Sequence, residues 1–238
     1  MTSYLYPSRF FRKEWRWFER PNDTGADIVN VFSYENVDVP GFKKKTGLTT
    51  VIDLTKSEEE LRAALRKRFI REQMEKGKKN GVTVCVGIDW HEFVPVYEEF
   101  RKGKRIASDD PRVFAHCLVA GAYYDGTLVS GGAFVADGIH IRALALASRR
   151  FASDGRMREV VGQANRMLIW ETILWAKREG YHLFDLGGIA PESADPTERS
   201  LAEFKEAFGG ERKPCYYYTR VNSPILKLWL RLRRFLRI

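Results

Sequence analysis

Residues 157–189, MREVVGQANRMLIWETILWAKREGYHLFDLGGI, and residues 201–211, LAEFKEAFGGE, decide the fold. When the first part of this stretch is plotted at 100° per residue, its apolar side chains gather on one side, so that side must face a core. The segment HLFDLGGI alternates as a strand does. We therefore expect a long helix, a buried strand and a second helix, in this order.

Three charged side chains interrupt these apolar surfaces. Glu171 falls within the apolar stripe of the long helix, Asp185 projects from the strand, and Lys205 lies between Leu201 and Phe208 on the second helix. A charged group on an apolar surface is costly unless a partner compensates it or its pKa shifts. These residues are therefore candidates for function.

The composition excludes a disordered chain and disfavours a metal centre. The 238 residues are 44% hydrophobic, enough for a sizeable core. Cys85, Cys117 and Cys215 are far apart, and the four histidines form no HExxH motif. We expect no metal site, no disulfide framework and a reducing compartment.

The net charge of +9 is concentrated at the two ends of the chain. Residues 1–20 hold five basic and two acidic side chains, and residues 223–238 hold five basic and no acidic ones, which leaves +1 for the body. No apolar run is long enough to span a bilayer, and the N-terminus does not resemble a signal peptide. We expect a cytoplasmic protein with basic ends that meet an anionic partner.

The first 48 residues are expected to form an arm and a strand region. The aromatic side chains of Phe11, Trp15 and Phe18 recur at helical spacing among basic residues. This pattern fits a segment at a membrane interface, or a helix or arm that caps the core.

A capping box, Ser57 with Glu60, predicts a helix that continues to about Lys76. Eight basic and two acidic residues lie within 62–79. The pattern fits phosphate binding or a solvated helix face.

A meander of three strands is expected over 116–148. Its turns are Asp125-Gly126 and Asp137-Gly138, because glycine accepts the positive φ of tight hairpins. A last strand, PCYYYTRV, follows the second helix. Meander, helix, strand, helix and strand in this order predict an α+β, GNAT-like fold: a mixed, mostly antiparallel sheet flanked by helices.

The tail, SPILKLWLRLRRFLRI, predicts a basic amphipathic helix that begins at Ser223 and Pro224. An apolar face opposite unbalanced cations is typical of a helix that lies on an anionic membrane, although such a helix also fits docking on its own domain or on a partner. The candidate membrane-binding residues are Lys227, Trp229, Arg231 and Arg234.

Three motifs resemble a known family. NRMLIWETILWAKREGYHLFDLGGI at 165–189, FKEAFGGE at 204–211 and the segment 51–84 are similar to the Fem-type (FemAB-like) peptidoglycan aminoacyltransferases of the GNAT acyltransferase superfamily and to their relatives in polysaccharide gene clusters. The resemblance covers about residues 50–220. It implies transfer of an aminoacyl group, commonly from aminoacyl-tRNA, to an amine of a cell-wall precursor.

The resemblance also suggests roles for single residues. Phe204 and Lys205 look like the family's Phe-Lys pair, whose lysine stabilises developing negative charge. A cation on an apolar face suits that role, because it acts in a low dielectric. The candidate substrate-binding residues are Arg142, Asn165, Gly187 and Gly188.

Two acids have a functional and a structural interpretation. Glu171 or Asp185 is a candidate to orient the acceptor amine or to accept its proton. The structural alternative pairs Glu171 with an arginine such as Arg142 and binds Asp185 to backbone amides near the two glycines.

One loop bears on which molecule donates the acyl group. Acetyl-CoA enzymes of this fold use an R/Q-x-x-G-x-G/A loop, whose amides cradle pyrophosphate. The nearest match here begins with an acid, Glu159, followed by Gly162 and Ala164. We therefore expect no tightly bound cofactor and rank aminoacyl-tRNA above acyl-CoA as the donor.

These observations lead to one expected function and two alternatives. The first is an acyltransferase at the inner face of the membrane that acts on an amine of an envelope or polysaccharide precursor, with its catalytic domain in 49–222 between an N-terminal region, 1–48, and the tail, 223–238. The second is an N-acyltransferase that uses acyl-CoA or acyl carrier protein on an amino acid or amino sugar. The third is a non-catalytic module that binds membranes or RNA.

Overall fold

The computed structural model describes residues 3–6, 11–66, 68–105, 110–152 and 154–235. The chain divides into two compact units, residues 49–213 and residues 1–48 with 214–238. The three-part division expected from the sequence stays a prediction.

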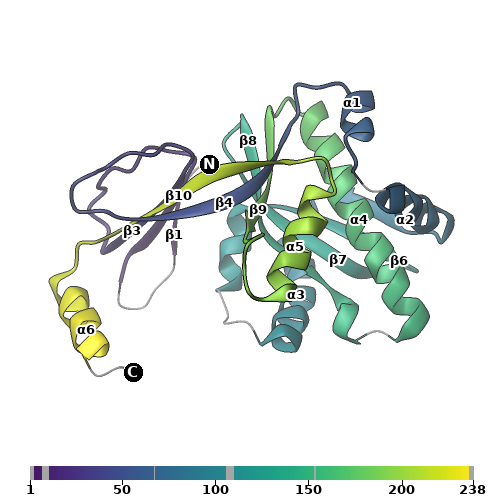
Figure 1. The fold of residues 1–238 in the computed structure, drawn as a ribbon. Helices are drawn as coiled ribbons and strands as arrows, with labels where there is room; N and C mark the ends of the chain where they lie inside the picture. The colour runs from purple at the N-terminus through teal and green to yellow at the C-terminus, as the bar shows by residue number, and fades with distance from the viewer. Residues whose placement is uncertain (1–2, 7–10, 67, 106–109, 153, 236–238) are drawn as a thin grey trace. The chain divides into compact units, whose positions relative to one another are not determined.

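The architecture is α+β, as expected (Figure 1). Ten strands follow one another in the order β1-β2-β3-β10-β4-β9-β8-β7-β6-β5. Most of the strand pairs are antiparallel, and the pairs β2–β3 and β8–β9 are parallel, so the sheet is mixed. The strands are β1 (Ser3–Tyr6), β2 (Lys13–Trp17), β3 (Ile28–Ser33), β4 (Lys43–Asp53), β5 (Thr83–Val86), β6 (Leu118–Tyr124), β7 (Thr127–Ala136), β8 (His140–Ser148), β9 (Leu183–Ile189) and β10 (Glu211–Val221).

The expected meander is confirmed in the unit 49–213. Strands β6, β7 and β8 pair antiparallel in sequence order. Asp125 and Gly126 both have positive φ, 49° and 67°, which is the geometry of the tight turn predicted from this dipeptide. The helices of this unit are α1 (Glu58–Ala63), α2 (Arg68–Lys79), α3 (Trp90–Lys104), α4 (Gly155–Arg178) and α5 (Pro196–Glu206), with short 3₁₀ turns at Pro111–His116 and Arg149–Ala152.

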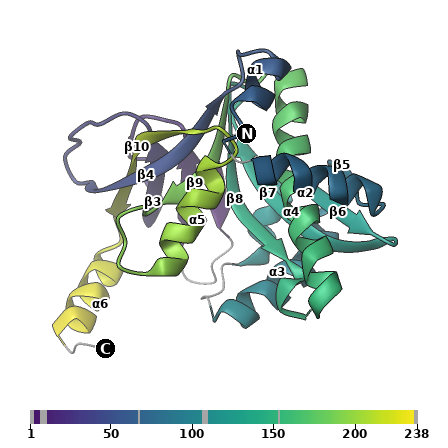
Figure 2. The ribbon, with the colours of Figure 1, turned by 45° about the vertical axis from the view of Figure 1, so that its right-hand side comes forward.

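Helices α3 and α4 pack on opposite faces of this meander (Figure 2). Phe93 of α3 lies against Gly131 of β7, where an added Cβ would be only 2.5 Å from the ring, so the glycine makes room for the phenylalanine. On the other face, α4 shares one core with Phe134 and Phe184, whose rings are 5.8 Å apart. Strand β9 is buried on both faces and continues directly from this core.

The helix predicted from Ser57 to about Lys76 is interrupted. Its capping box is present, since the Ser57 hydroxyl accepts from Glu60 N and the Glu60 carboxylate accepts from Ser57 N. Helix α1 ends at Ala63, however, and α2 begins at Arg68. The N–H of Arg66 donates to the carbonyl of Ala207 at 3.1 Å, so a tertiary contact replaces a helical bond there.

The unit formed by residues 1–48 and 214–238 contains strands β1 to β3 and most of β10. Its core includes Val29, Val31 and Tyr218, and the Tyr218 hydroxyl donates to Glu35 O at 2.7 Å. The helical interpretation of the N-terminal aromatic residues is wrong. Lys13–Trp17 is strand β2, in which Trp15 and Trp17 share a face and stack with centroids 5.0 Å apart.

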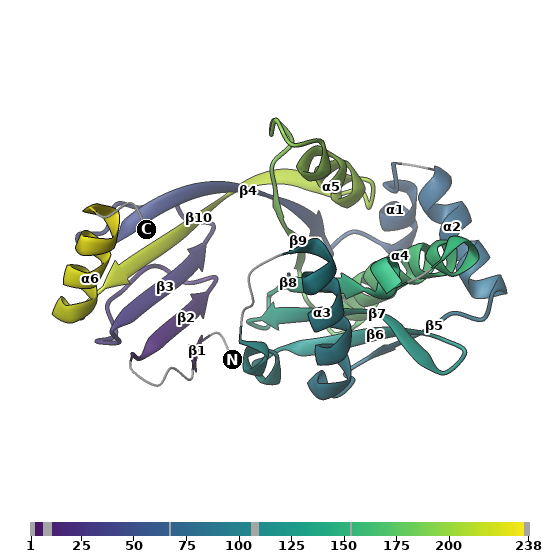
Figure 3. The same ribbon diagram turned by 90° about the horizontal axis from the view of Figure 1, so that it is seen from below.

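The tail forms the expected helix, α6 (Pro224–Phe235), which Figure 3 shows in yellow. The Ser223 hydroxyl accepts from Leu226 N at 3.4 Å, which is a capping contact. Leu226 is buried, whereas a set of large apolar side chains on this helix is exposed: Ile225, Leu228, Trp229 and Leu232. Within the described residues, no helix combines the length and the apolar character that crossing a bilayer requires.

We predict that Phe184→Ala lowers the free energy of unfolding by about 3 to 5 kcal/mol, because it leaves a cavity in the shared core of α4 and β9. Phe184 is fully buried. Denaturant unfolding followed by circular dichroism measures the change. The control, Leu201→Ala on the exposed side of α5, is expected to change stability by less than about 0.5 kcal/mol. Equal losses in the two variants would contradict this location of the core.

Candidate functional site

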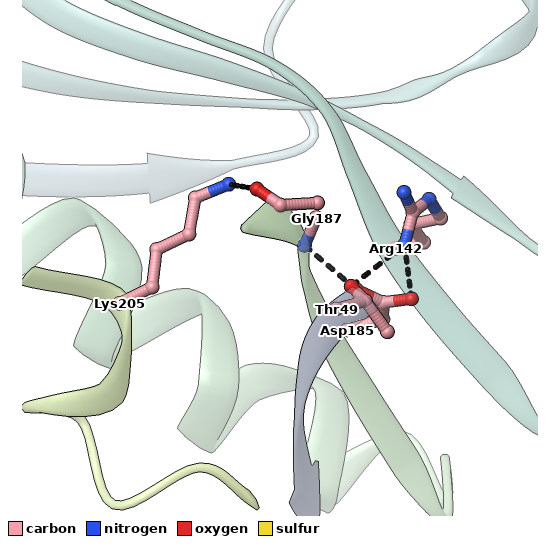
Figure 4. Close-up of polar contacts among 6 residues, drawn as sticks. Thr49, Arg142, Asp185, Gly187 and Lys205 are labelled. Carbon is pink, nitrogen blue, oxygen red and sulfur yellow. Dashed lines mark hydrogen bonds and ion pairs between the residues drawn. The ribbon is translucent and has the colours of Figure 1, made fainter. Parts of the chain in front are cut away.

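Lys205 is a buried cation of the unit 49–213. It lies on α5, only 8% of its surface is exposed, and its Nζ donates to the carbonyl of Gly188 at 2.8 Å (Figure 4). An ammonium group has three N–H donors. The structure records this one hydrogen bond for Nζ, so two donors are left for an incoming acceptor.

Gly187 makes the close approach of the lysine possible. Its φ of +85° belongs to the region that favours glycine, and an added Cβ would lie 3.3 Å from Lys205 Nζ and 3.2 Å from Ala143 O. The two glycines of the FDLGGI motif therefore have separate functions. Gly187 leaves space beside the amine, and Gly188 supplies the carbonyl that holds it.

Asp185 and Arg142 form a buried ion pair next to these two glycines of β9. Asp185 is fully buried and Arg142 is 4% exposed. The Asp185 carboxylate accepts from Arg142 Nη1, from the Thr49 hydroxyl and from Gly187 N, the last at 2.7 Å, and Arg142 Nη1 also donates to Thr49 Oγ1 at 3.1 Å (Figure 4). These contacts join strands β4, β8 and β9 beside the two glycines of β9.

The site holds more positive than negative charge. The pKa of Lys205 is lowered to about 8, mainly by burial and in addition by the nearby cation of Arg142, while the carboxylate of Asp185 opposes the shift. Among the described residues, Asp185 is the carboxylate recorded beside these two cations, and all three side chains are buried. Such a site is suited to stabilise a negative charge that appears during a reaction.

The structure brings together five of the residues singled out from the sequence: Lys205, Asp185, Arg142, Gly187 and Gly188. Phe204 precedes the lysine on α5. Its ring is partly buried, with its centroid 5.4 Å from that of Phe208. The structural alternative for Asp185 is present in the contact with Gly187 N.

Glu171 and Asn165 form no recorded contact with this cluster. Glu171 is partly exposed on α4, and no ion pair to it is found among the described residues. The expected pairing of Glu171 with Arg142 is wrong, because Arg142 pairs with Asp185. Asn165 instead accepts a hydrogen bond from the Ser130 hydroxyl at 3.1 Å.

The tail residues belong to the other unit. The side chain of Lys227 is exposed, and that of Trp229 is 52% exposed. The side chains of Arg231 and Arg234 lie outside the described residues. Their role in membrane binding stays a prediction.

Sequence reasoning missed Thr49. It appears only as part of an expected strand, LTTVIDL, in which two consecutive threonines are the one available signal. Both Thr49 and Thr50 are fully buried. Since neighbouring strand residues point to opposite faces, two buried polar side chains in a row indicate that each face has something to bond or to pack against.

Comparison with known proteins supports the fold through structure alone. No protein-family model and no curated protein sequence matches the chain. Solved structures do match. FemX shares 13% identity at a TM-score of 0.64, over 94% of this chain and 85% of FemX. L-PGS from Bacillus licheniformis shares 16% identity at a TM-score of 0.55, over 87% of this chain and 72% of that chain.

The chain has a FemAB-like GNAT fold. A third match is a C-terminal domain (DUF2156) from Agrobacterium fabrum, in a protein named for lysylphosphatidylglycerol synthesis, with 14% identity at a TM-score of 0.57 over 96% of this chain and 86% of that domain. The fold implied by the FDLGGI and FKEAFGGE motifs is therefore confirmed. In this FemAB-like fold, Lys205 lies beside Gly187 and Gly188, near the C-terminal end of β9.

We predict that the difference in unfolding free energy between the wild-type protein and Lys205→Met depends on pH. The folded-state pKa of Lys205 is about 8 and the unfolded value is 10.5, so between these values the unfolded chain binds more protons than the folded one. The wild type should therefore gain stability relative to the variant by about 1.4 kcal/mol per pH unit as the pH rises above 8.

Denaturant titrations at pH 7, 8, 9 and 9.5 measure this difference. Subtracting the unfolding free energy of the variant from that of the wild type at each pH removes the contributions of the other titrating groups. A difference that stays constant over this range would show that the lysine is not held as a buried cation.

Proposed function

We propose that this protein is an acyltransferase that moves an aminoacyl group from an ester donor to an amine of a cell-envelope or polysaccharide precursor. The observation that supports this function best is the buried amine of Lys205, which has one recorded acceptor and lies beside a turn where glycine leaves space. The FemAB-like fold supports the same reaction class.

The reaction follows from the charges of the site. The acceptor amine attacks the ester carbonyl, a C–N bond forms, and the carbonyl oxygen becomes negative. The ammonium of Lys205 donates to this oxyanion. When the intermediate collapses, the C–O bond to the donor breaks, the donor oxygen takes up a proton, and the products are an amide and an alcohol.

In this proposal, Asp185 and Arg142 are positioning residues. Asp185 is fully buried and already accepts three hydrogen bonds, so it is poorly suited to collect a proton from a substrate. It holds Gly187 N, and through it the turn that receives Lys205. Glu171, the other acid singled out from the sequence, has no recorded contact with this cluster, so we assign it no part in the step, and the proton of the attacking amine passes to the leaving donor oxygen.

We further propose that aminoacyl-tRNA is the donor and that α6 holds the protein on an anionic membrane surface. The exposed apolar side chains of α6 support the second point, since Leu228 is 59% and Leu232 is 53% exposed. Phosphatidylglycerol is a second acceptor to assay, because one similar structure belongs to a protein named for lysylphosphatidylglycerol synthesis. Its acceptor group is a hydroxyl, so the new bond would be C–O and the product an ester, while the donor C–O bond breaks as before.

We predict that Lys205→Ala lowers kcat for transfer from aminoacyl-tRNA by about 100- to 1,000-fold, because an oxyanion donor is lost while the fold remains. Transfer of a labelled aminoacyl group to a pool of envelope precursors and to phosphatidylglycerol vesicles measures the rate. The matched control is Lys177→Ala. This lysine also donates to a backbone carbonyl, Leu54 O at 3.0 Å, but from α4 and outside the cluster.

The control variant is expected to retain transfer within about threefold. Equal activity of wild type and Lys205→Ala, both folded, would contradict the assignment of Lys205. Turnover with acyl-CoA but not with aminoacyl-tRNA would favour the N-acyltransferase alternative. Salt-dependent RNA binding without turnover by any donor would favour the non-catalytic alternative.

We predict that Leu228→Glu weakens binding to phosphatidylglycerol vesicles by at least about tenfold, because it places a charge on the apolar side of α6 and repels the anionic surface. Flotation with vesicles of defined composition measures the bound fraction. The control is Leu201→Glu, which makes the same substitution at an exposed leucine of α5. Co-flotation that is the same for both variants would contradict membrane binding through α6.

A further inference from the structure

A further cation, Arg166, lies next to the Phe-Lys pair, and no carboxylate among the described residues forms an ion pair with it. Arg166 is on α4, and its guanidinium carbon lies 5.2 Å from the centroid of the Phe69 ring and 5.6 Å from that of Phe204. The two rings come from α2 and α5. Arg166 is therefore held by aromatic faces from two other helices, an arrangement that fixes its plane without neutralising its charge.

The hydrogen bonds of Arg166 are incomplete. Nη1 donates to the carbonyl of Gly162 at 2.6 Å, one turn earlier on α4. Nε is buried and has no hydrogen-bond partner in the structure. A buried donor without a partner costs free energy, so it calls for an explanation.

The electrostatic surroundings of Arg166 are unfavourable. Burial lowers its pKa, and the nearby cation of Arg150 lowers it further. No ion pair to Arg166 is formed within the described part of the chain. Arg166 is partly buried, and an arginine largely removed from water usually has an acidic partner unless something else supplies the negative charge.

We propose that Arg166 binds a phosphate ester of the substrate beside the Phe204 ring, while Lys205 acts on the ester that reacts. This inference rests on the proposed function and deepens it. A guanidinium offers paired N–H donors that match two phosphate oxygens, and the unused Nε is one of these donors. Arg150, which is exposed, adds a second positive charge near the same place.

The placement fits a substrate that carries a phosphate close to its reacting group. Phe204 and Lys205 are adjacent on α5, so the ring that contacts Arg166 and the amine on Gly188 O belong to one helical turn. A phosphodiester at Arg166 has two chemically equivalent sources: the last nucleotide of a tRNA donor, and the headgroup of a phospholipid acceptor. The experiment below separates them.

The experiment measures binding of two probes to the full-length protein. One is a labelled RNA minihelix with the 3′-terminal CCA sequence, followed by fluorescence anisotropy, and the other is short-chain phosphatidylglycerol below its critical micelle concentration, followed by calorimetry. The variants are Arg166→Gln, Arg166→Lys and, as control, Arg156→Gln. Arg156 is exposed on the same helix.

We predict that Arg166→Gln weakens binding of one probe by about 10- to 100-fold, the usual loss for a charge-assisted hydrogen bond, and that the probe affected identifies the source of the phosphate. Arg166→Lys recovers part of the loss because it keeps the charge. Arg156→Gln stays within about twofold. For the RNA probe, the slope of log Kd against log salt concentration becomes smaller by about one in Arg166→Gln, as expected when one phosphate contact is lost.

Stability distinguishes this role from a structural one. Because Arg166 is an uncompensated cation, Arg166→Gln should unfold at the same or a higher denaturant concentration than the wild type at pH 7. Binding of both probes within twofold of wild type would overturn the proposal. So would equal losses in Arg166→Gln and Arg166→Lys with a lower unfolding midpoint, since the side chain would then only hold the two rings.

A failure of this inference and a failure of the proposed function give different results. If the wild type transfers aminoacyl groups and Arg166→Gln does so with unchanged KM, only the phosphate site is wrong. If the wild type binds a probe through Arg166 and transfers nothing, only the reaction is wrong.

Discussion

The site depends on two buried cations, Lys205 and Arg142, that lie near the two glycines of β9. Lys205 and Arg142 are both buried, and Asp185 is their single recorded carboxylate partner. Asp185 also holds Gly187 N, so the same group that balances one cation shapes the turn that receives the other. A folded chain gains no stability from a buried charge without a counterion. The free-energy cost of this buried positive charge is explained if a negative charge forms next to it during the reaction.

The same reasoning connects two features that are separate in sequence. Arg166 is stacked on Phe69 and Phe204, lacks a carboxylate partner among the described residues, and leaves Nε without a bond. Lys205 follows Phe204 directly. Both cations thus lie near one turn of α5. In the proposal, a phosphate of the substrate compensates Arg166, and the oxyanion that forms during the reaction compensates Lys205. Functional sites often contain such locally unfavourable groups, which the rest of the core must outweigh.

Much of this fold could be predicted from local patterns. The long helix α4, the buried strand β9 and the hairpin turn at Asp125 each have a strong periodic or turn signal, and all are present. The aromatic spacing near Trp15 left a helix open beside an arm, whereas strand pairing gives β2, because tertiary contacts override a short periodic pattern. The interrupted helix α1–α2 could not be foreseen either, since its break depends on a bond to a distant carbonyl.

The site was predictable to the extent that a buried charge stands out in an apolar pattern. Lys205 and Asp185 satisfied that criterion, but their partners did not. Thr49 is 136 residues away from Asp185 in sequence, and its hydroxyl is an ordinary feature of a strand. Arg142 was a candidate for substrate binding and, in the structural alternative, a possible partner of Glu171, and only the parallel pairing of β8 with β9 places it opposite Asp185. Side chains that meet across strands need the register, which local sequence does not provide.

The most direct test of the central claim is a titration of the Lys205 amine by NMR in the folded protein, with and without a phosphonate analogue of the tetrahedral intermediate. The account gives a pKa of about 8 for the free protein and a higher pKa in the complex, because an anion beside the amine favours its charged form. An amine that titrates at 10.5 or above in the free protein, or a pKa that does not change when the analogue binds, would contradict it.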